Sequence, residues 1–388
     1  MGVVIKYRGD SDVWRNLSSI AERHTEIFGS KPDGVYRAPG RVNLIGEHTD
    51  YNDGYVLPTP IDRYLQVSMK KRTDNKLDLY ALDFNERLQY SLDGFILDKE
   101  YSWANYVLGV VQALKRRGYK LKGVDMCITG NVPIGVGLSS SAAFETAVVR
   151  GFKDLFGLDL DPVEAAYVGK ECENDFIGLQ SGIMDQFVSS LGEYGKALFI
   201  DCRSNEHSLH ELSDDVRVVI VNSMMDRSVA SSEYNIRHAQ CLEAVNIIKV
   251  KYPEIKALRD VSEEMLLDQW HNLPDLIARR ARHVVTENKR VLESKTLLDR
   301  GDMIDFGELM YDSHDSLRHD YQVSSKHLDT LVNSTMDLDG VLGARLTGAG
   351  FGGCTVNLVE ADYVEEFTET ITERYFKRTA KKCEIIVA

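Results

Sequence analysis

The stretch GRVNLIGEHTDYNDG, residues 40–54, joins the end of a predicted strand to a polar loop. Apolar and β-branched residues from Val35 to Asn43 predict the strand, and the segment from Gly46 to Gly54 is too polar and glycine-bearing to continue it. The loop carries Glu47, His48 and Asp50 close to Arg41. One histidine or a few acidic residues would be ordinary loop chemistry, but so many short donors and acceptors in one segment favour a site for a polyhydroxy ligand.

A second informative segment, PIGVGLSSSA at residues 133–142, follows a predicted strand and opens a predicted helix from about Ser140 to Phe156. Its glycines allow close approach of the backbone to a ligand, and a helix N-terminus with free N–H groups suits a phosphate. The segment is not a Walker A loop, because GxxxxGK[ST] occurs nowhere in the chain. A plain turn in which Ser139, Ser140 or Ser141 caps the helix is the alternative interpretation.

A third glycine-rich segment, GAGFGG at residues 348–353, fits the pattern GxGxxG. In a dinucleotide-binding unit this pattern opens a helix. Here the residues that follow, Cys354 to Val359, predict a strand, so we reject that interpretation. The segment is expected to be a turn between two strands, which either lets a neighbouring loop or ligand approach closely or serves only as a structural hairpin.

The composition of the 388-residue chain is that of an ordinary soluble globular protein, with 43% hydrophobic and 27% charged residues. A net charge of −14 disfavours nucleic acid as a partner. No apolar run approaches the ~20 residues of a membrane span, and Met1 to Asp12 lacks the apolar core of a secretory signal. The six cysteines form no CxxC pair and are expected to be reduced and mostly buried. We therefore expect a cytoplasmic, monomeric protein with no membrane or nucleic-acid partner.

Predicted helices and strands are mixed along the chain without strict alternation, which favours an α+β fold with two domains over one doubly wound sheet. Helices are predicted at residues 13–29, 103–117, 162–176 and 363–377, and several more between about 231 and 336. Strands are predicted at 64–70, 77–81, 124–129, 216–221, 344–347 and 384–387. The polar stretch from Asp201 to Asp215 is the best candidate boundary, giving domains at 1–205 and 206–388.

Taken together, segments 37–54, 130–142 and 345–354 resemble the three motifs of the GHMP small-molecule kinases. Residues 40–54 resemble the galactokinase signature of that superfamily almost letter for letter. Further similar segments are WANYV at 103–107, GIMDQF at 182–187, IDCRS at 200–204, ASSEY at 230–234 and SHDSLR at 313–318. The resemblance implies a ribosomal-S5-like N-terminal domain and a ferredoxin-like C-terminal domain, with the active site in the cleft between them.

The resemblance also implies the roles of individual residues. Asp185 would lie beside the C1 hydroxyl of galactose as the catalytic carboxylate, with Arg41 near it. The positions that resemble sugar contacts are Glu47, His48, Asp50, Gly182 and Tyr234. The positions that resemble the ATP site are Trp103, Tyr106, Pro133, Gly135, Gly137, Leu138, Ser139, Ser140, Ser141 and Ala142. The magnesium environment of the family matches Ser140 or Ser141 together with Glu173.

These matches imply an ATP- and Mg²⁺-dependent kinase that phosphorylates galactose at C1. Two alternatives remain open at this stage: a non-catalytic galactose and ATP sensor, and a kinase for N-acetylgalactosamine, arabinose or a uronic acid. The sequence departs from the family pattern at residues 224–227, where MMDR replaces a more basic segment, and at Asn131, His319, Gln322 and His327. None of these positions belongs to the expected catalytic set, so they bear on substrate preference and domain contacts.

Overall fold

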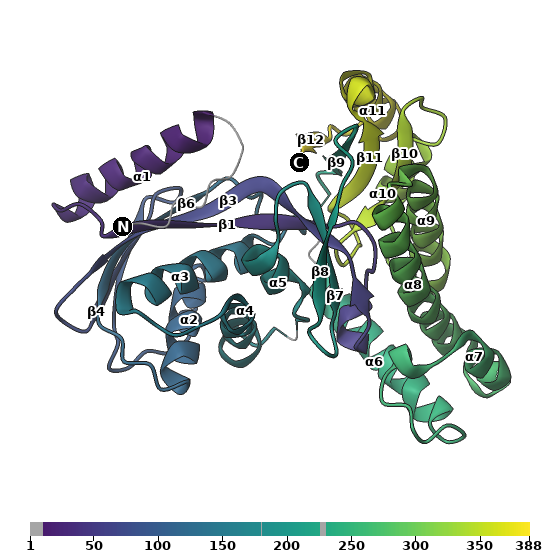
Figure 1. Ribbon diagram of the computed structural model, residues 1–388, viewed down its shortest axis with the longest axis horizontal. Coiled ribbons are helices and arrows are strands. Elements are labelled where there is room, and N and C mark those ends of the chain that lie inside the picture. The colour runs from purple at the N-terminus through teal and green to yellow at the C-terminus, as the bar shows by residue number, and fades with distance from the viewer. Residues whose placement is uncertain (1–10, 180, 226–229) are drawn as a thin grey trace. The chain divides into compact units, whose positions relative to one another are not determined.

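The computed structural model describes residues 11–179, 181–225 and 230–388 (Figure 1). Most of the N-terminal segment considered for a secretory signal, and residues 226 and 227 of the departing MMDR segment, lie outside the described residues. Contacts divide the chain into two compact units that interleave in sequence. The first comprises the residues up to Gly40, Arg63–Val132 and Ser139–Tyr194; the second comprises Arg41–Asp62, Pro133–Leu138 and Gly195–Ala388.

The first unit is built on a five-stranded sheet with the order β1-β3-β6-β4-β5. Its strands are β1 (Gly34–Asn43), β3 (Pro58–Lys71), β4 (Lys76–Ala81), β5 (Glu86–Ser91) and β6 (Val124–Gly130), of which β1 and β3 extend into segments of the second unit. Its helices are α1 (Ser11–Phe28), α2 (Ala104–Arg116), α3 (Ser140–Phe156), α4 (Pro162–Glu171), the π-helical segment η2 (Cys172–Ile177) and α5 (Met184–Leu191). Strand β6 runs antiparallel to β3 and parallel to β4.

The two faces of this sheet carry different side chains because successive residues of a strand point to opposite sides. Val67 and Met69 of β3 join the main apolar core, which includes buried residues of α2, α3 and α4. Ser68, between them, faces α1 and lies 2.9 Å from Nδ1 of the buried His24. Helices α2, α3 and α4 therefore cover one face of the sheet and α1 the other (Figure 1).

The second unit contains two sheets, one of four strands in the order β10-β11-β9-β12 and one of three strands in the order β2-β7-β8. Its strands are β2 (Tyr55–Val56), β7 (Lys196–Asp201), β8 (His207–Glu211), β9 (Val216–Asn222), β10 (Val341–Thr347), β11 (Cys354–Glu360) and β12 (Glu384–Val387). Its helices are α6 (Ala230–Ile248), α7 (Glu263–Gln269), α8 (Asp275–Arg300), α9 (Met303–Ser316), α10 (Lys326–Asn333) and α11 (Val364–Thr379). The short helical segments are η1 (Asp50–Asn52), η3 (Leu258–Asp260), η4 (Trp270–Asn272), η5 (Leu317–Tyr321) and η6 (Ala361–Tyr363).

Two apolar clusters hold the second unit together. One packs α11 against the four-stranded sheet through Val219, Val221, Phe367, Ile371 and Tyr375. The other lies among α6, α7, α8 and η5. The long helix α8 ends at Gly301, which adopts the left-handed conformation with φ 72°. Left-handed glycine just past the last turn is the usual way to end a helix, so the sequence fixes the length of α8 locally.

The α+β fold class is confirmed, and several predicted elements agree closely with the structure. The helix predicted from Ser140 to Phe156 is α3 with those bounds, and the predicted strands at 124–129 and 354–359 correspond to β6 and β11. The helix predicted at 162–176 is wrong as one element: α4 ends at Glu171 and the chain continues as the π-helical segment η2. A wider helical turn absorbs an extra residue without interrupting the apolar pattern, which is why periodicity did not reveal it.

Two further expectations concern cysteines and membrane spans. All six cysteines are free thiols, four of them buried and two half-buried, which confirms the expectation. In the described part of the chain no helix combines the length and apolar character needed to cross a bilayer.

Candidate active site

Asp185 lies in the first turn of α5, where the positive end of the helix dipole stabilises a carboxylate. The hydroxyl of Ser139 donates a short hydrogen bond to the Asp185 carboxylate. Ser139 precedes α3 and adopts the left-handed conformation with φ 58°. The side chain of Ser139 is directed to α5 and makes no hydrogen bond that caps α3, so the alternative interpretation of a capping serine does not hold for Ser139. The predicted phosphate segment and the predicted catalytic carboxylate thus meet within the first unit.

Glu173 lies in the π-helical segment η2 and is 5% exposed. Its carboxylate accepts a hydrogen bond from the hydroxyl of Ser181, and the hydroxyl of Ser141 nearby lowers its pKa. The Nε2 of Gln186 lies 3.1 Å from a carboxyl oxygen of Glu173 and 3.1 Å from one of Glu145. Burial raises the pKa of Glu173, and burial raises that of Glu145 still further above its usual range. Two buried carboxyl groups are therefore bridged by a neutral amide rather than by a cation.

This carboxyl pair suits a divalent cation bound together with phosphate oxygens. Mg²⁺ takes oxygen ligands and retains waters, so one carboxylate and one hydroxyl of the protein are enough. Glu173 and Ser141, whose hydroxyl acts on the pKa of Glu173, supply that pair. Within residues 11–179, 181–225 and 230–388, no group of three or more His, Cys, Asp or Glu side chains is placed to hold a metal ion by itself. The donor set thus fits a metal that arrives with a phosphate ligand.

The predicted adenine-side residues lie at the N-terminal end of α2 in the same unit. Trp103 precedes α2, is half-buried, and donates from its indole N–H to Glu86 over 2.6 Å. Tyr106 is also half-buried, with its ring 6.0 Å from that of Phe144 in α3. Both rings pack against the core of the first unit and keep part of their surface exposed. Their role in binding a base stays a prediction.

The glycine-bearing half of the predicted phosphate segment, residues 133–138, belongs to the second unit and is tied to Arg41 there. The backbone N–H of Arg41 donates to the carbonyl of Leu138 over 3.1 Å, and its Nη1 donates to the carbonyl of Gly137 over 2.6 Å. The thiol of Cys354, at the start of β11, lies 3.5 Å from the carbonyl of Val136. Arg41 therefore helps to fix the conformation of the segment that the resemblance assigns to ATP.

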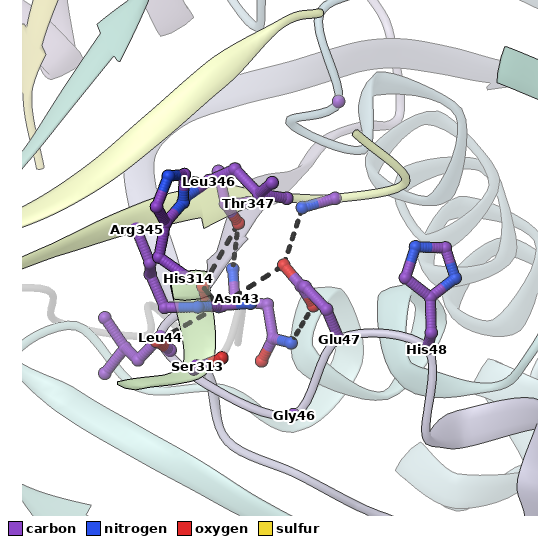
Figure 2. Close-up of polar contacts among 12 residues, drawn as sticks. Asn43, Leu44, Gly46, Glu47, His48, Ser313, His314, Arg345, Leu346 and Thr347 are labelled. Carbon is purple, nitrogen blue, oxygen red and sulfur yellow. Dashed lines mark hydrogen bonds and ion pairs between the residues drawn. The ribbon is translucent and has the colours of Figure 1, made fainter. Parts of the chain in front are cut away.

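Glu47 is 2% exposed, and both of its carboxylate oxygens have partners in the second unit (Figure 2). The Nδ2 of Asn43 donates to one oxygen; the backbone N–H of Gly348 donates to the other over 2.6 Å. The guanidinium of Arg345, itself fully buried, lies 3.5 Å from that second oxygen. Glu47 thus ties the 40–54 segment to the glycine-rich turn after β10. Its predicted contact with a sugar hydroxyl stays a prediction.

That glycine-rich turn, residues 348–353, joins β10 to the antiparallel β11. This observation confirms the expectation of a turn between two strands and the rejection of a dinucleotide-binding fingerprint. The N–H of Phe351 donates to the carbonyl of Val323 over 2.7 Å. The turn therefore lies against a neighbouring loop, in agreement with the interpretation that its glycines allow a loop or ligand to approach closely.

His48 lies in a cluster of aromatic rings. Its ring centroid is 4.7 Å from that of Tyr321 and 5.7 Å from that of Tyr234. Nδ1 lies 2.8 Å from the hydroxyl of Tyr51 and Nε2 lies 3.3 Å from the carbonyl of Ala349. Burial lowers the pKa of His48 well below its usual range, so the ring is neutral at pH 7. A carbonyl can only accept, so Nε2 carries the proton and Nδ1 accepts from Tyr51.

The remaining predicted sugar residues differ in exposure. Asp50, at the start of the short segment η1, is half-buried, in contrast to the buried Glu47 and His48. Tyr234 in α6 is half-buried and touches the aromatic cluster through its ring, 4.9 Å from that of Tyr51. Gly182, in the first unit, lies in the turn before α5. Asp50 is thus the predicted sugar residue of the loop whose carboxylate is most open to a ligand.

Several residues that surround Glu173 in the first unit or hold the 46–54 loop in the second were not predicted from the sequence. Glu145 and Gln186 in the first unit and Arg345 in the second lie within or beside segments that the sequence analysis singled out, but they were given no role. Three further residues, His283, Glu287 and Asn288, lie on one of the helices predicted between about 231 and 336 and were given no role. The available signal was their polarity: all three are less than 10% exposed in the middle of α8, where apolar residues would be expected.

Three family models match the chain. One, described as the galactokinase galactose-binding signature, matches residues 22–71; models of the GHMP kinase N-terminal domain and C-terminal region match residues 105–193 and 294–377. Galactokinase from Roseiflexus sp. strain RS-1 is 46% identical over 372 residues, which cover 96% of this chain and 95% of that protein. The chain belongs to the galactokinase family of the GHMP kinases.

Other members of the galactokinase family agree with this assignment. Galactokinase from Chloroflexus aurantiacus is 43% identical over 371 residues, covering 96% of this chain and 95% of that protein. The crystal structure of Lactococcus lactis galactokinase complexed with galactose superposes with a TM-score of 0.91 at 36% identity, covering 96% of this chain and 97% of that one. Mevalonate kinase from Methanococcus jannaschii, at 19% identity and a TM-score of 0.62 over 91% of this chain and 97% of that one, shares the fold.

Proposed function

We propose that this chain transfers the γ-phosphoryl group of ATP to the C1 hydroxyl of galactose and releases galactose 1-phosphate and ADP. The observation that carries the proposal is the contact between Asp185 and Ser139. It brings the family's catalytic carboxylate to the start of α3, at the segment that resembles the ATP loop. The galactokinase relatives, which match this chain over nearly its whole length, support the choice of galactose as substrate.

In the proposed reaction Asp185 accepts the proton of the C1 hydroxyl. The freed oxygen forms a bond to the γ-phosphorus while the bond from that phosphorus to the β–γ bridging oxygen breaks, and ADP leaves with the bonding electrons. Phosphoryl transfer depends mainly on positioning and on stabilisation of charge. Ser139 holds the carboxylate of Asp185 in place at the first turn of α5.

The sugar would be oriented by the 46–54 loop, with Asp50 accepting from hydroxyls and Tyr234 and Gly182 lining the ligand. Glu47 and His48 would contribute partly through the internal contacts that already fix them. Arg41 would hold the carbonyl of Gly137 and thereby the ATP segment, and its charge would favour the anionic phosphates. Pro133, Gly135, Leu138, Ser140 and Ala142 are proposed to contribute to the same segment, with Trp103 and Tyr106 on the side of the base.

Glu173, with Ser141 or Ser140, would hold Mg²⁺. The cation, when bound, neutralises charge on the phosphate groups. Burial among neutral partners leaves the Glu173 carboxylate poorly compensated, so a divalent cation would stabilise its charged form. Such a site contains too few protein ligands to hold the cation without the phosphate groups.

The experiment that tests the proposal is an ATP-to-ADP assay on the purified chain with a panel of sugars, run with Mg²⁺ and with a chelator. The panel contains galactose, N-acetylgalactosamine, arabinose, galacturonic acid and glucose. We expect the fastest turnover on galactose and its loss with the chelator. Saturable galactose binding without turnover would instead identify a sensor. Faster turnover on another sugar would keep the reaction type and overturn the choice of substrate.

A domain boundary near residue 205, a cytoplasmic location and a monomeric state complete the proposal. The family models for the N-terminal and C-terminal domains end at residue 193 and begin at residue 294, which leaves room for that boundary. Light scattering of the purified chain checks the monomeric state, and an apparent mass of about twice the 43.8 kDa of one chain would contradict it.

A further inference from the structure

One face of helix α8 holds the backbone of the segment from Gly46 to Tyr55, which we call the sugar loop. The carboxylate of Glu287 accepts from the N–H of Gly46 over 2.9 Å. The Oδ1 of Asn288 accepts from the N–H of Tyr55 over 2.9 Å. The Nε2 of His283 donates to the carbonyl of Glu47 over 3.1 Å. Positions i and i+4 of a helix share one face, and position i+5 lies beside that face, so three side chains of one helix reach both ends of the loop.

All three residues are buried, and His283 and Glu287 are themselves fixed by further contacts. His283 is fully buried, and its Nδ1 lies 2.9 Å from the hydroxyl of Ser316. Burial lowers the pKa of His283 to about 4, so its neutral ring has one donor, which goes to the loop. Glu287 also accepts from Arg290 and from Ser313, each over 2.7 Å. The helix therefore presents preoriented groups to the loop rather than flexible side chains.

The sequence of the loop is adapted to this close approach. Gly46 has φ 101°, and a Cβ at this position would lie 2.9 Å from a methyl group of Val291 in α8. A Cβ at Gly54 would lie 2.4 Å from Oδ1 of Asn288. Any side chain at either position would push the loop away from α8. Both glycines of the 46–54 segment are thus explained by the helix that they pack against.

The contacts with α8 are made to backbone atoms, which leaves the side chains of the loop for other partners. The hydroxyl of Thr49 lies 2.8 Å from the carbonyl of Gly46 and 2.6 Å from that of Tyr55, which closes the loop across its own ends. Binding several hydroxyls of a sugar requires donors and acceptors at fixed positions, and a loop that is ordered in advance loses less entropy on binding.

We propose that His283, Glu287 and Asn288 are positioning residues that hold the sugar loop in its binding conformation. The inference rests on the proposed function for the identity of the sugar, but the clamp itself is a property of α8 and the loop. It predicts that weakening the clamp weakens galactose binding while leaving ATP binding unchanged, because the contacts of these three residues are to the loop and its neighbours in the second unit.

The test compares Asn288→Ala with Val284→Ala. Asn288→Ala removes the acceptor for Tyr55 N–H, and its exposed fraction of 7% makes it the least buried member of the clamp. Val284→Ala removes buried apolar volume from the same helix, within its apolar cluster, and keeps all three side chains that bond to the loop backbone. Calorimetric titration with galactose and with ATP gives both dissociation constants, and thermal melting gives the loss of stability for each variant.

We expect Asn288→Ala to raise the dissociation constant for galactose about tenfold and that for ATP less than twofold, as the loss of one buried hydrogen bond to a preorganised loop implies. Val284→Ala should lower the melting temperature at least as much and leave both constants within twofold. Unchanged galactose affinity in Asn288→Ala, or an equal loss in both variants, would overturn the positioning role.

Hydrogen exchange of peptides that span residues 46–55 separates this inference from the proposed function. Asn288→Ala should speed exchange in that segment and Val284→Ala should not, whether or not the wild-type chain binds galactose. No galactose binding by the wild type, with faster loop exchange in Asn288→Ala, would refute the substrate and support the clamp. Exchange that is the same in the wild type and Asn288→Ala would refute the clamp alone. Should Asn288→Ala fail to fold, Asn288→Leu, which keeps a branched side chain but also removes the acceptor for Tyr55 N–H, serves in its place and should likewise speed loop exchange.

Discussion

The two units each bury a group of acidic side chains, and the two groups are compensated in opposite ways. In the first unit Glu145 and Glu173 are surrounded in the described structure by amide, hydroxyl and thiol groups, and burial raises the pKa of both. In the second unit Glu287 pairs with Arg290 and Glu47 lies beside Arg345. Burial raises the pKa of Glu287 too, but the charge of Arg290 and other neighbours outweighs it and lowers that pKa to about 2.

The difference separates a structural group of carboxylates, which are paired with arginines inside the fold, from a reaction group, whose charge a bound ligand or metal ion would compensate. A buried carboxylate with a guanidinium partner is satisfied internally, and removing it leaves an uncompensated cation. A buried carboxylate among neutral groups costs stability, and such a cost is typical of functional sites. On this view Glu47 and Glu287 shape the sugar loop, whereas Glu173 and Asp185 serve the reaction.

The largest expected effect is on the reaction group. Asp185→Asn should lower kcat by about 10³-fold or more, because a positioned base contributes roughly 10²–10⁴-fold and the charge near the phosphoryl group is also lost. Binding of galactose and of ATP, measured by calorimetry, should change less than fivefold. Glu193→Gln, an exposed carboxylate shortly after α5, is the matched control and should keep normal turnover. Turnover above a tenth of the wild-type value in Asp185→Asn would contradict the catalytic assignment.

The second effect is on the structural group. Glu287→Gln should lower the free energy of unfolding by about 3 kcal/mol, because it leaves Arg290, whose side chain is only 13% exposed, without a counter-charge. Urea denaturation at pH 7 measures the change. Glu293→Gln, an exposed position on the same helix, should change it by less than about 0.5 kcal/mol. A Glu287→Gln variant as stable as the wild type would show that the Glu287 carboxylate does not stabilise the fold, and would contradict its assignment to the structural group.

The pH dependence of stability sharpens the same distinction. The pKa of Glu287 is lowered to about 2. At Asp201, Arg259 and backbone N–H groups outweigh the effect of burial and also lower the pKa to about 2. A carboxyl group with a lowered folded-state pKa contributes stability above its unfolded-state value near 4, and this contribution is lost as pH falls towards 2.

Urea denaturation between pH 5 and pH 2.5 should therefore show a steady loss of stability in the wild type. Glu287→Gln should show a shallower slope, since it no longer takes up a proton on unfolding at low pH. Equal slopes in the two proteins would mean that the Glu287 carboxylate is not stabilised by its neighbours.

A smaller effect is expected at Glu173. Glu173→Gln should raise the Mg²⁺ concentration for half-maximal turnover about 10- to 100-fold while leaving the melting temperature equal or higher, because the buried charge is removed. A Mg²⁺ titration of turnover and a thermal melt measure both. Asp175→Asn, an exposed neighbour in the same π-helical segment, is the control. Strong destabilisation with an unchanged Mg²⁺ requirement would place Glu173 in the structural group.

The smallest effect concerns Asp50, a half-buried acid of the sugar loop. Asp50→Asn should raise KM for galactose about tenfold, the value of one charge-assisted hydrogen bond, and change KM for ATP less than twofold. Initial rates at varied sugar and fixed ATP give the ratio. A rise in both constants would show that Asp50 acts on the whole enzyme rather than on the sugar.

The elements around the functional segments could be predicted well because their signals are local. The glycines and serines of 133–142 followed by an apolar helical pattern gave the bounds of α3, and the strand after GAGFGG excluded a dinucleotide site. The π-helical segment η2 was missed because an inserted residue leaves the apolar pattern of α4 nearly intact.

The residues of the site were harder to assign because their roles depend on partners far away in sequence. Nothing in the stretch 40–54 shows that Glu47 binds Gly348 and lies beside Arg345, or that α8 holds both ends of the loop. Residue type suggested that Glu47 and His48 bind a sugar. In the folded chain the polar side-chain atoms of both residues lie within hydrogen-bonding distance of other protein groups. Tertiary partners, which a local pattern does not encode, decide whether a polar group faces a ligand or the interior.

The measurement that tests the central claim most directly is ³¹P NMR of the wild-type chain incubated with ATP, Mg²⁺ and galactose. Loss of the γ-phosphate signal should be matched, mole for mole, by ADP and by a sugar phosphate whose phosphorus couples to the C1 proton, and Asp185→Asn should give neither. A phosphate on another carbon, or ADP with inorganic phosphate alone, would contradict the account.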